Sequence, residues 1–228
     1  MRVLAIDTAL EACAAAVLDT REGAVVARES EPMTRGHAEE LMPLVKRVME
    51  RAALDFKALD RIAVTVGPGS FTGLRVGIAA ARGLSLAIGR PAVGITTLAA
   101  FAAPLIAADD TLPVVAAIDA RHEHVYLHVF GPGGRTLVSP RLASLRDALR
   151  ASVSSRAPRL VGTAAALLAA EWPGRERPPR SVDQRGAPEI EWVAQLGSAA
   201  GEQATPPSPF YLRAPDAHPQ DGTLIARR

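Results

Sequence analysis

The chain has 228 residues, 48% of them apolar, which is enough for a buried core in one domain or in two small lobes. It carries 26 basic and 24 acidic side chains, divided evenly into 12 and 11 before Pro104 and 14 and 13 after it. A protein that binds nucleic acid on its own usually has a clustered basic surface, so this balance argues against autonomous binding of DNA or RNA.

The first predicted elements are a strand and a hairpin. Residues 2–6 (RVLAI) form a short run, apolar except for Arg2, that leads into Asp7, and two strand-like stretches, 12–19 and 23–30, follow around a turn. Cys13, the single cysteine, is expected to be a small core residue and excludes an internal disulfide. This cysteine usage is typical of a reducing compartment, so we expect a cytoplasmic protein.

Two helices with unusual faces are predicted next. Apolar residues repeat at helical spacing over 38–53 and cover an arc of about 160°, which is more than one core contact needs. The strand 61–66 leads through a glycine-rich loop into a second helix, 70–88, whose charges are Arg75 and Arg82 on one narrow stripe. Small residues line another face of this helix, so we expect it to be covered on nearly every side.

Residues 91–108 contain 18 positions without a charge, which raises the question of a membrane span. Pro91, Gly94 and Pro104 favour a buried strand followed by a capped helix instead. We therefore expect no membrane partner.

The N-terminal pattern recurs in the second half of the chain. Residues 114–119 end in Ala-Ile-Asp, as residues 2–7 do, and a strand and a glycine-rich turn follow. Such a duplication implies two lobes built on similar sheets, which we place at 1–104 and 105–228. The alternation of strands and helices indicates an α/β fold with mixed sheets.

The remainder of the second half contains shorter elements. We predict a helix over 142–150, a strand over 159–162 and a last helix near 188–200. Residues 173–188 hold four Pro and four Arg, which predicts an exposed loop.

A candidate nucleotide cleft lies at the ends of the first strand of each lobe. Asp7 and Asp119 are suited to bind a nucleotide's metal or to orient water, with the alternative that each caps a turn. The loop 67–73 joins a strand to a helix, which favours anion binding, but it lacks the Gly-Lys-Ser/Thr ending of a P-loop. Its glycines alternatively serve a tight turn and close helix packing. The cleft candidates are Asp7, Thr8, Gly67, Gly69, Ser70, Asp119 and Gly162.

Three histidines, His122, His124 and His128, are predicted on one face of a strand. The first two would make half of a metal site, but His128 would lie on the order of 20 Å from His122, so a third ligand is missing. A solvent-facing polar side of a hairpin is the interpretation that we favour. We assign no metal ligand and no catalytic residue.

Several segments closely resemble one bacterial family. They are Ile6–Ala9, the His37–Pro43 segment HAEELMP, VGPGSFTGLRVGIAAARGLSLA (66–87), PAVGITTLAA (91–100), AIDARHEHVY (117–126) and PFYLRAP (209–215). These segments are similar to the TsaB family, formerly called YeaZ. The resemblance implies the duplicated fold of the actin, Hsp70 and acetate kinase superfamily. It also implies a role in making threonylcarbamoyladenosine next to the anticodon of tRNAs that read codons beginning with adenine.

The resemblance also implies partners. In that system another enzyme makes threonylcarbamoyl-adenylate, the related protein TsaD transfers the group to tRNA, and the small ATPase TsaE joins TsaD and its TsaB-type partner. TsaD-type proteins carry a His-x-x-x-His metal motif, and the corresponding positions here are Thr97 and Phe101. Neither side chain can replace an imidazole, so the Lewis acid is lost. We therefore expect a non-catalytic scaffold that requires no cofactor, binds ATP or ADP weakly at most, and contacts tRNA through the complex.

The resemblance implies a function for the two helices 38–53 and 70–88. Similar proteins dimerise through them, so we expect helices 38–53 and 70–88 to bind TsaD, with a homodimer as the alternative when TsaD is absent. The predicted interface residues are Leu41, Met42, Val45, Met49, Phe71, Gly73, Leu74, Arg75, Gly77, Ala81 and Arg82. The competing interpretation is that these faces only pack on each other.

Two enzymatic hypotheses stand beside the scaffold. One is a nucleotide hydrolase or phosphotransferase that uses Asp7, Asp119 and the loop 67–73. The other is a glycoprotease-like peptidase, for which the chain shows neither a zinc-binding helix motif nor a nucleophile with an evident base.

Overall fold

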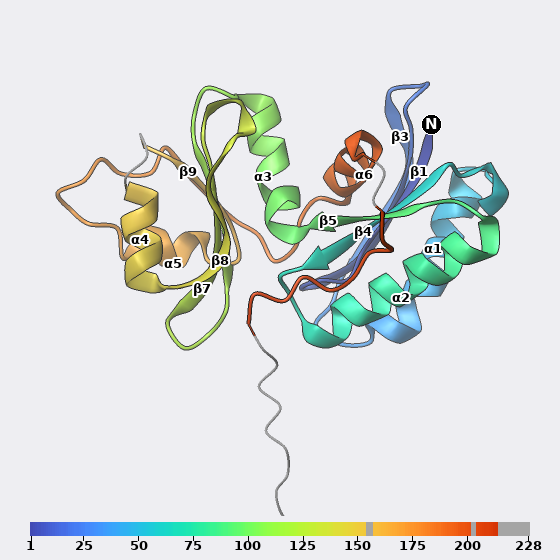
Figure 1. Cartoon of the computed structure of the whole chain (residues 1–228), viewed down its shortest axis with the longest axis horizontal. Coiled ribbons are helices and arrows are strands. Elements are labelled where there is room, and N and C mark those ends of the chain that lie inside the picture. The colour runs from blue at the N-terminus through green and yellow to red at the C-terminus, as the bar shows by residue number, and fades with distance from the viewer. Residues whose placement is uncertain (154–156, 202–203, 214–228) are drawn as a thin grey trace, which may run out of the picture.

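Two lobes stand side by side in the computed structural model, which describes residues 1–153, 157–201 and 204–213 (Figure 1). Each lobe is built around a five-stranded mixed sheet. The last two positions of the PFYLRAP segment, and the rest of the predicted second lobe beyond them, lie outside the described residues.

The two sheets have the same topology. The first contains β1 (Arg2–Asp7), β2 (Ala12–Asp19), β3 (Ala24–Pro32), β4 (Arg61–Gly67) and β5 (Ala92–Thr96), in the order β3-β2-β1-β4-β5. The second contains β6 (Val114–Asp119), β7 (His124–Phe130), β8 (Thr136–Ser144), β9 (Arg159–Gly162) and β10 (Ser181–Gln184), in the order β10-β9-β6-β7-β8. In each sheet the first three strands are antiparallel, and the fourth runs parallel to the first. The predicted duplication and the predicted α/β fold of two lobes with mixed sheets and flanking helices are confirmed.

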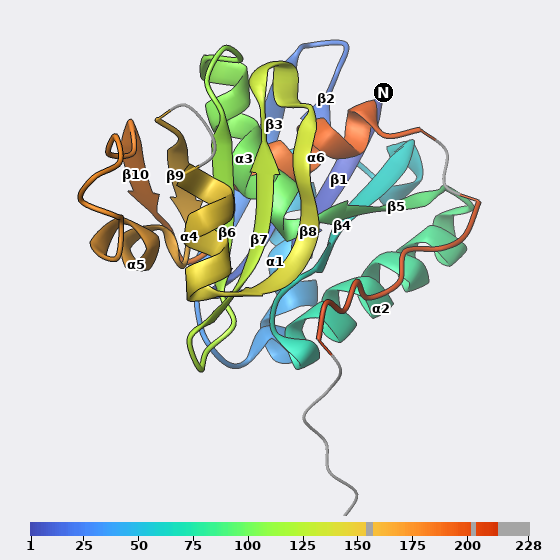
Figure 2. The same ribbon diagram turned by 60° about the vertical axis from the view of Figure 1, so that its left-hand side comes forward.

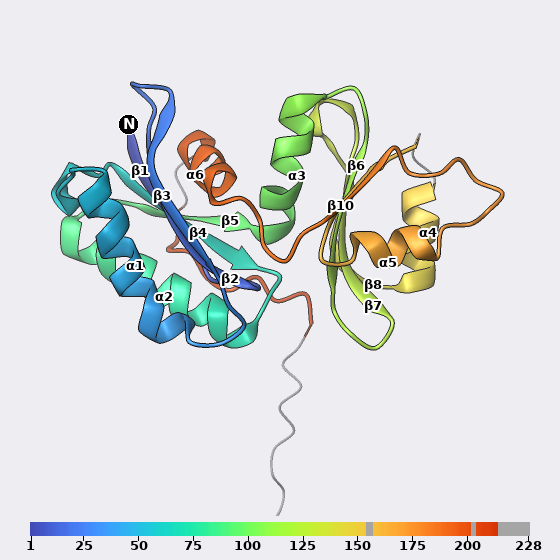
Figure 3. The ribbon, with the colours of Figure 1, turned by 180° about the vertical axis from the view of Figure 1, so that it is seen from behind.

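Helices cover both faces of each sheet. On the first sheet, α1 (His37–Arg51) and α2 (Phe71–Ile88) pack on one face and α6 (Ile190–Ala199) packs on the other. Helix α3 (Thr97–Ala108) lies between the lobes, against β6, while α4 (Leu145–Val153) and α5 (Ala165–Ala170) cover the far face of the second sheet (Figures 1 and 3). Residues 91–108 thus form a strand and a capped helix, as predicted.

The alternation of side chains along β1 explains why both faces need cover. Leu4 and Ile6 point into the core under α1 and α2, whereas Val3 and Ala5 point to the core under α6. Every residue of β2 is buried as well. A strand that is buried on both faces has a continuous run of apolar residues, and this is the pattern of residues 3–6.

Two predictions about the second half of the chain differ from the structure. We predicted a loop over 173–188, but strand β10 lies inside this stretch. Its four residues pair in parallel with β9, although most of their side chains are exposed. Helix α6 belongs to the first lobe, where Gly197 lies so close to Ala63 that a β-carbon would not fit. The predicted second lobe, 105–228, therefore returns to the first lobe before the chain ends.

The prediction that the three histidines face solvent is wrong for His128. Its side chain is buried, its ring centroid lies 3.8 Å from that of Phe130, and its Nε2 is 3.1 Å from Oγ1 of Thr136. His124 is exposed on β7, and His122 lies before the strand in a left-handed turn. Burial lowers the pKa of His128 to about 4 from its usual 6.5.

This histidine should make the stability of the protein depend on pH. Because the folded-state pKa is lowered, neutral His128 contributes stability above the unfolded-state pKa that is lost as the pH falls from about 6.5 to about 4. Urea unfolding should show a loss of up to about 3 kcal/mol over this range that is missing from His128→Leu, which takes up no proton. Equal losses in both proteins would show that His128 is not the group responsible.

Candidate functional site

The carboxyl group of Asp7 is enclosed at the end of β1. Its Oδ1 accepts hydrogen bonds from the Thr65 hydroxyl at 2.5 Å and the Ala9 amide at 3.0 Å, while Oδ2 has no protein partner among the described residues. Burial raises the pKa of this carboxyl above its usual value, although the two hydrogen bonds and the charge of His37 act in the opposite direction. Asp7 is fully buried, so it presents no oxygen to a solvent-filled cleft.

The glycine-rich loop before α2 is filled by the chain's own backbone. The Ser70 amide donates to the carbonyl of Ala9 at 2.7 Å, and the Thr8 hydroxyl donates to the carbonyl of Gly73 at 2.7 Å. A β-carbon on Gly69 would overlap the carbonyl of Ala9, and one on Gly73 would overlap the carbonyl of Thr8. The glycines therefore serve the close packing of α2 against the β1–β2 turn, which was the alternative to anion binding.

A segment from the far end of the chain closes the other side of this loop. We call residues 207–211 the C-terminal strap; it follows α2 along its length (Figures 1 and 2). The Phe210 amide donates to the carbonyl of Val66 at 2.7 Å, and a β-carbon on Gly67 would lie 2.9 Å from the carbonyl oxygen of Phe210. The loop is thus enclosed between the β1–β2 turn and the strap.

The cleft candidates of the second lobe have a different environment. Asp119 is exposed, and its Oδ1 accepts the Arg121 amide at 2.7 Å, which makes it a turn cap. Gly162 has a φ of +111°, and a β-carbon there would overlap the carbonyl of Ala117. Asp7 and Asp119 are therefore not an equivalent pair, because one is buried and the other faces solvent.

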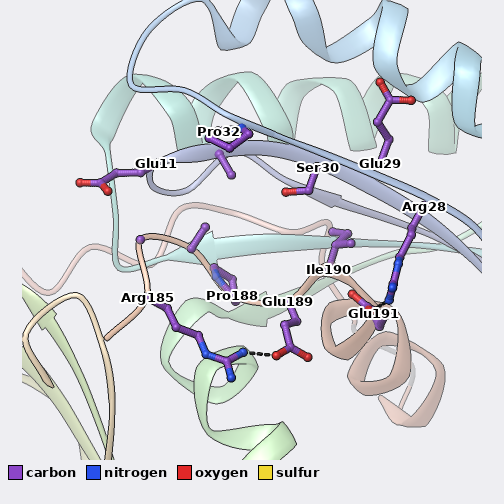
Figure 4. A pocket seen from close by; sticks show the side chains of 13 residues that line it. Glu11, Arg28, Glu29, Ser30, Pro32, Arg185, Pro188, Glu189, Ile190 and Glu191 are labelled. Atoms are coloured by element: carbon purple, nitrogen blue, oxygen red, sulfur yellow. Dashed lines mark hydrogen bonds and ion pairs between the residues drawn. The ribbon is translucent and has the colours of Figure 1, made fainter. Parts of the chain in front are cut away.

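A well-formed pocket lies elsewhere, between β3 and the segment that leads into α6 (Figure 4). Its volume is about 710 Å³, and it is lined by residues 11–12, 28–30, 32 and 185–191. Arg28 pairs with Glu191, and Arg185 pairs with Glu189, so its cations are already neutralised. None of the predicted cleft residues lines it.

The positions that correspond to the metal-binding motif of TsaD-type proteins do not fit a metal. Thr97 and Phe101 are buried on α3, next to the core of the second lobe, and neither has a ring nitrogen. Within the described ranges, no group of three or more His, Cys, Asp or Glu side chains is placed to hold a metal ion.

The predicted interface residues divide into two groups. Those that are buried in the first lobe cannot reach a partner, and for them the interface prediction is wrong: Leu41, Val45, Met49, Gly73, Leu74, Gly77 and Ala81. The wide apolar arc of α1 is explained by its simultaneous contacts with β2, β3 and α2. Those that are exposed remain candidates: Met42, Phe71, Arg75 and Arg82.

We expected other parts of the protein to cover helix α2 on nearly every side, but much of its surface is exposed. Of the described helices, it is the one long and apolar enough by length and composition to cross a membrane, yet only 28% of it is buried. Ala79 and Leu86 are among the exposed residues of this helix that the sequence did not lead us to predict. A helical wheel places both opposite the buried residues Leu74 and Ala81, and that signal was available in the sequence.

The stripe of Arg75 and Arg82 also has a role within the chain. Nε of Arg82 donates to the carbonyl of Pro207 at 2.8 Å, and Nε of Arg75 donates to the hydroxyl of Tyr211 at 3.3 Å. Both arginines therefore hold the C-terminal strap against α2.

Comparisons with known proteins find similarity to TsaD, to TsaB and, over more of the chain, to YeaZ-like structures. The family model of TsaD, tRNA N6-adenosine threonylcarbamoyltransferase, matches residues 22–165. The TsaB protein of Escherichia coli (strain K12), named as a tRNA threonylcarbamoyladenosine biosynthesis protein, is 39% identical over 126 residues, which are 55% of this chain and 53% of that protein. The chain thus spans about half the length of this curated relative.

Two solved structures from Pseudomonas aeruginosa match nearly the whole chain. An uncharacterised protein with similarity to the peptidase YeaZ has a TM-score of 0.78 and 31% identity, covering 93% of this chain and 99% of its own. YeaZ has a TM-score of 0.76 and 30% identity, covering 92% of this chain and 99% of its own.

Replacing the buried carboxyl should reveal whether it serves the fold. A raised folded-state pKa means that the Asp7 carboxyl contributes stability below its unfolded-state pKa, near 3.8, which is lost as the pH rises through the folded-state value. Asp7→Asn keeps the acceptor for Thr65 and Ala9 without a charge, so urea unfolding at pH 7 should show a stability equal to or above that of the wild type.

Two controls accompany this measurement. Thr65→Val removes the hydroxyl donor and should lower the free energy of unfolding by about 1–3 kcal/mol. If Mg-ATP raised the melting temperature of the wild type but not of Asp7→Asn, the carboxyl would have to be assigned to a nucleotide site.

Proposed function

The chain belongs to the TsaB (YeaZ) family, and from this membership we propose that it is the non-catalytic scaffold subunit of a tRNA threonylcarbamoylation complex. In this proposal TsaD binds directly to α1 and α2, and TsaE joins the two proteins. TsaD transfers the threonylcarbamoyl group to the adenosine next to the anticodon of tRNAs that read codons beginning with adenine. The complex works in the cytoplasm, and this chain contacts tRNA only through it.

One observation carries the proposal: large apolar side chains remain exposed on one side of the first lobe. Of the seven that the described residues contain, four lie on α1, α2 or the strap, namely Met42, Phe71, Leu86 and Tyr211. Leu86 is 87% exposed. Contiguous apolar residues on a surface mark an interaction site. We define the docking face by six of the exposed residues of α1, α2 and the strap: Met42, Phe71, Arg75, Ala79, Leu86 and Tyr211.

The placement of α1 supports its share in this face. Arg47 and Arg51, on one flank of α1, pair with Glu29 of β3. Met42 lies on the opposite flank, and α2 packs beside α1 (Figures 1 and 3). The two helices are therefore neighbours on one side of the first sheet, and the contacts of α1 with β3 leave Met42 exposed.

A partner with the same fold suits this surface. Residues 22–165, which match the TsaD family model, include both helices. A TsaD protein would present an equivalent helix pair, and two equivalent pairs can pack face to face around a pseudo-two-fold axis. The same geometry accounts for a homodimer when TsaD is absent.

The enclosed cleft supports a non-catalytic role. The carboxyl of Asp7 is buried, and the amide of Ser70, which an anion would use, is bonded to Ala9. We therefore propose that the chain requires no cofactor and that any binding of ATP or ADP is weak.

A charge on the docking face should disrupt the complex. Ala79→Arg places a long cationic side chain at an exposed position of α2, where it would lose its hydration against an apolar partner. Calorimetry with TsaD should show at least a tenfold loss of affinity, and reconstitution with TsaD, TsaE, the adenylate-forming enzyme and unmodified tRNA should lose modification in proportion.

Leu167→Arg is the matched control, because it adds the same charge at an exposed apolar position of α5 on the second lobe. It should bind and function like the wild type. If Ala79→Arg bound TsaD normally, the docking face would be wrong, and robust ATP turnover by the isolated chain would favour the enzyme hypothesis.

A further inference from the structure

The C-terminal strap is anchored firmly enough to form part of the protein surface. Pro207 is buried, and its carbonyl accepts the hydrogen bond from Arg82. Three residues later, the Phe210 amide bonds to the end of β4, and the Phe210 side chain packs against the core of the first lobe. These attachments place Tyr211 at a fixed position over the start of α2.

Tyr211 completes an exposed cluster of two rings and a cation. Its ring stacks on that of Phe71 with centroids 5.3 Å apart, and the guanidinium carbon of Arg75 lies 3.7 Å from the centre of the Phe71 ring. Nε of Arg75 also donates to the Tyr211 hydroxyl. The two rings are 38% and 40% exposed, so the cluster faces outward rather than into the core.

We propose that Phe71, Arg75 and Tyr211 form the anchor point of the docking face, and that they receive from the partner an apolar side chain flanked by a carboxylate. This inference rests on the proposed function and adds to it that the strap, far from α2 in the sequence, is part of the binding surface.

The physical argument begins with preorganisation. Residues that dominate binding energy are enriched in aromatic side chains and arginine, and binding costs less when their rotamers are already fixed. Stacking fixes the two rings here, and the hydrogen bond and the cation–π contact fix Arg75. A second ring contact in the described residues, between His128 and Phe130, is buried and thus serves the core instead.

Charge determines what the anchor point receives. Arg75 and Arg82 are the charged residues of α2, which has no acidic side chain to neutralise them. Arg82 is turned to the strap, whereas Arg75 uses only Nε within the cluster, so its Nη groups are placed to donate to a carboxylate. The flat rings beside it suit an apolar side chain, and the combination selects a partner segment that offers both.

Calorimetric titration of TsaD into variants of this chain tests the proposal. Tyr211→Ala and Phe71→Ala should each weaken binding at least tenfold, and the double variant should lose less than the product of the two, because the rings act as one unit. Arg75→Gln should weaken binding most at low salt, since it removes a charge–charge contact.

Matched controls come from exposed apolar residues of the second lobe. Leu137→Ala and Val182→Ala truncate side chains of similar exposure and should leave the affinity unchanged. Unchanged circular dichroism and melting temperatures would show that the variants fold. If Tyr211→Ala disturbs the strap itself, Arg75→Gln remains a separate test, because it keeps both rings and leaves the strap contacts of Pro207 with Arg82 and of Phe210 with Val66 in place.

The possible results distinguish a failure of the anchor point from a failure of the proposed function. If Ala79→Arg abolishes binding while Tyr211→Ala, Phe71→Ala and Arg75→Gln bind like the wild type, the anchor point is wrong and the docking face stands. If Ala79→Arg also binds normally, the proposed function itself fails. Tenfold losses for the ring variants with normal Leu137→Ala and Val182→Ala support the anchor point.

Discussion

The backbone of the β1–β2 turn lies against the beginning of α2 at a distance that only glycine permits. Gly69 and Gly73 face the carbonyl groups of Ala9 and Thr8, and Gly77 faces the Thr8 side chain. This contact positions α2 on the first sheet, because the helix cannot approach so closely at any other register. It also uses the amide and hydroxyl groups that would otherwise be open to a ligand. The same contact therefore closes the cleft and directs the opposite side of α2 to solvent.

The closed cleft removes groups that nucleotide chemistry would need, whereas the exposed helix face provides a surface that a partner protein can bind. A duplicated fold with a carboxylate at the end of each first strand is suited to nucleotide chemistry, yet here Asp7 is sealed inside and Asp119 caps a turn. The surface that remains rich in large apolar groups is the outer side of α1, α2 and the strap. These two features are the ones on which the proposed scaffold role rests.

Periodicity in the sequence was sufficient to predict the duplicated sheets, since the Ala-Ile-Asp repeat marks the first strand of each. Periodicity did not predict the burial or the strand pairing of residues that depend on contacts between distant parts of the chain. Val45 and Gly77 have the pattern of an interface, but the sheet and the β1–β2 turn occupy that side of each helix. Strand β10 has too few apolar residues to be recognised, because its pairing with β9 supplies the stability. The burial of His128 likewise depends on contacts with Phe130 of the same strand and with Thr136 across the β7–β8 hairpin.

The return of α6 to the first sheet bears on how the protein is made. Ile190, Val193 and Ala194 cover Val3, Ala5 and Ala63, so one side of the first sheet stays uncovered until this helix has left the ribosome. The strap, which completes the outer side of α2, is synthesised later still. During translation, the second lobe can therefore fold around its own sheet while the first lobe waits for α6 and the strap. A chain truncated in this region would present an open apolar sheet, which makes it a substrate for chaperones and proteases rather than for assembly.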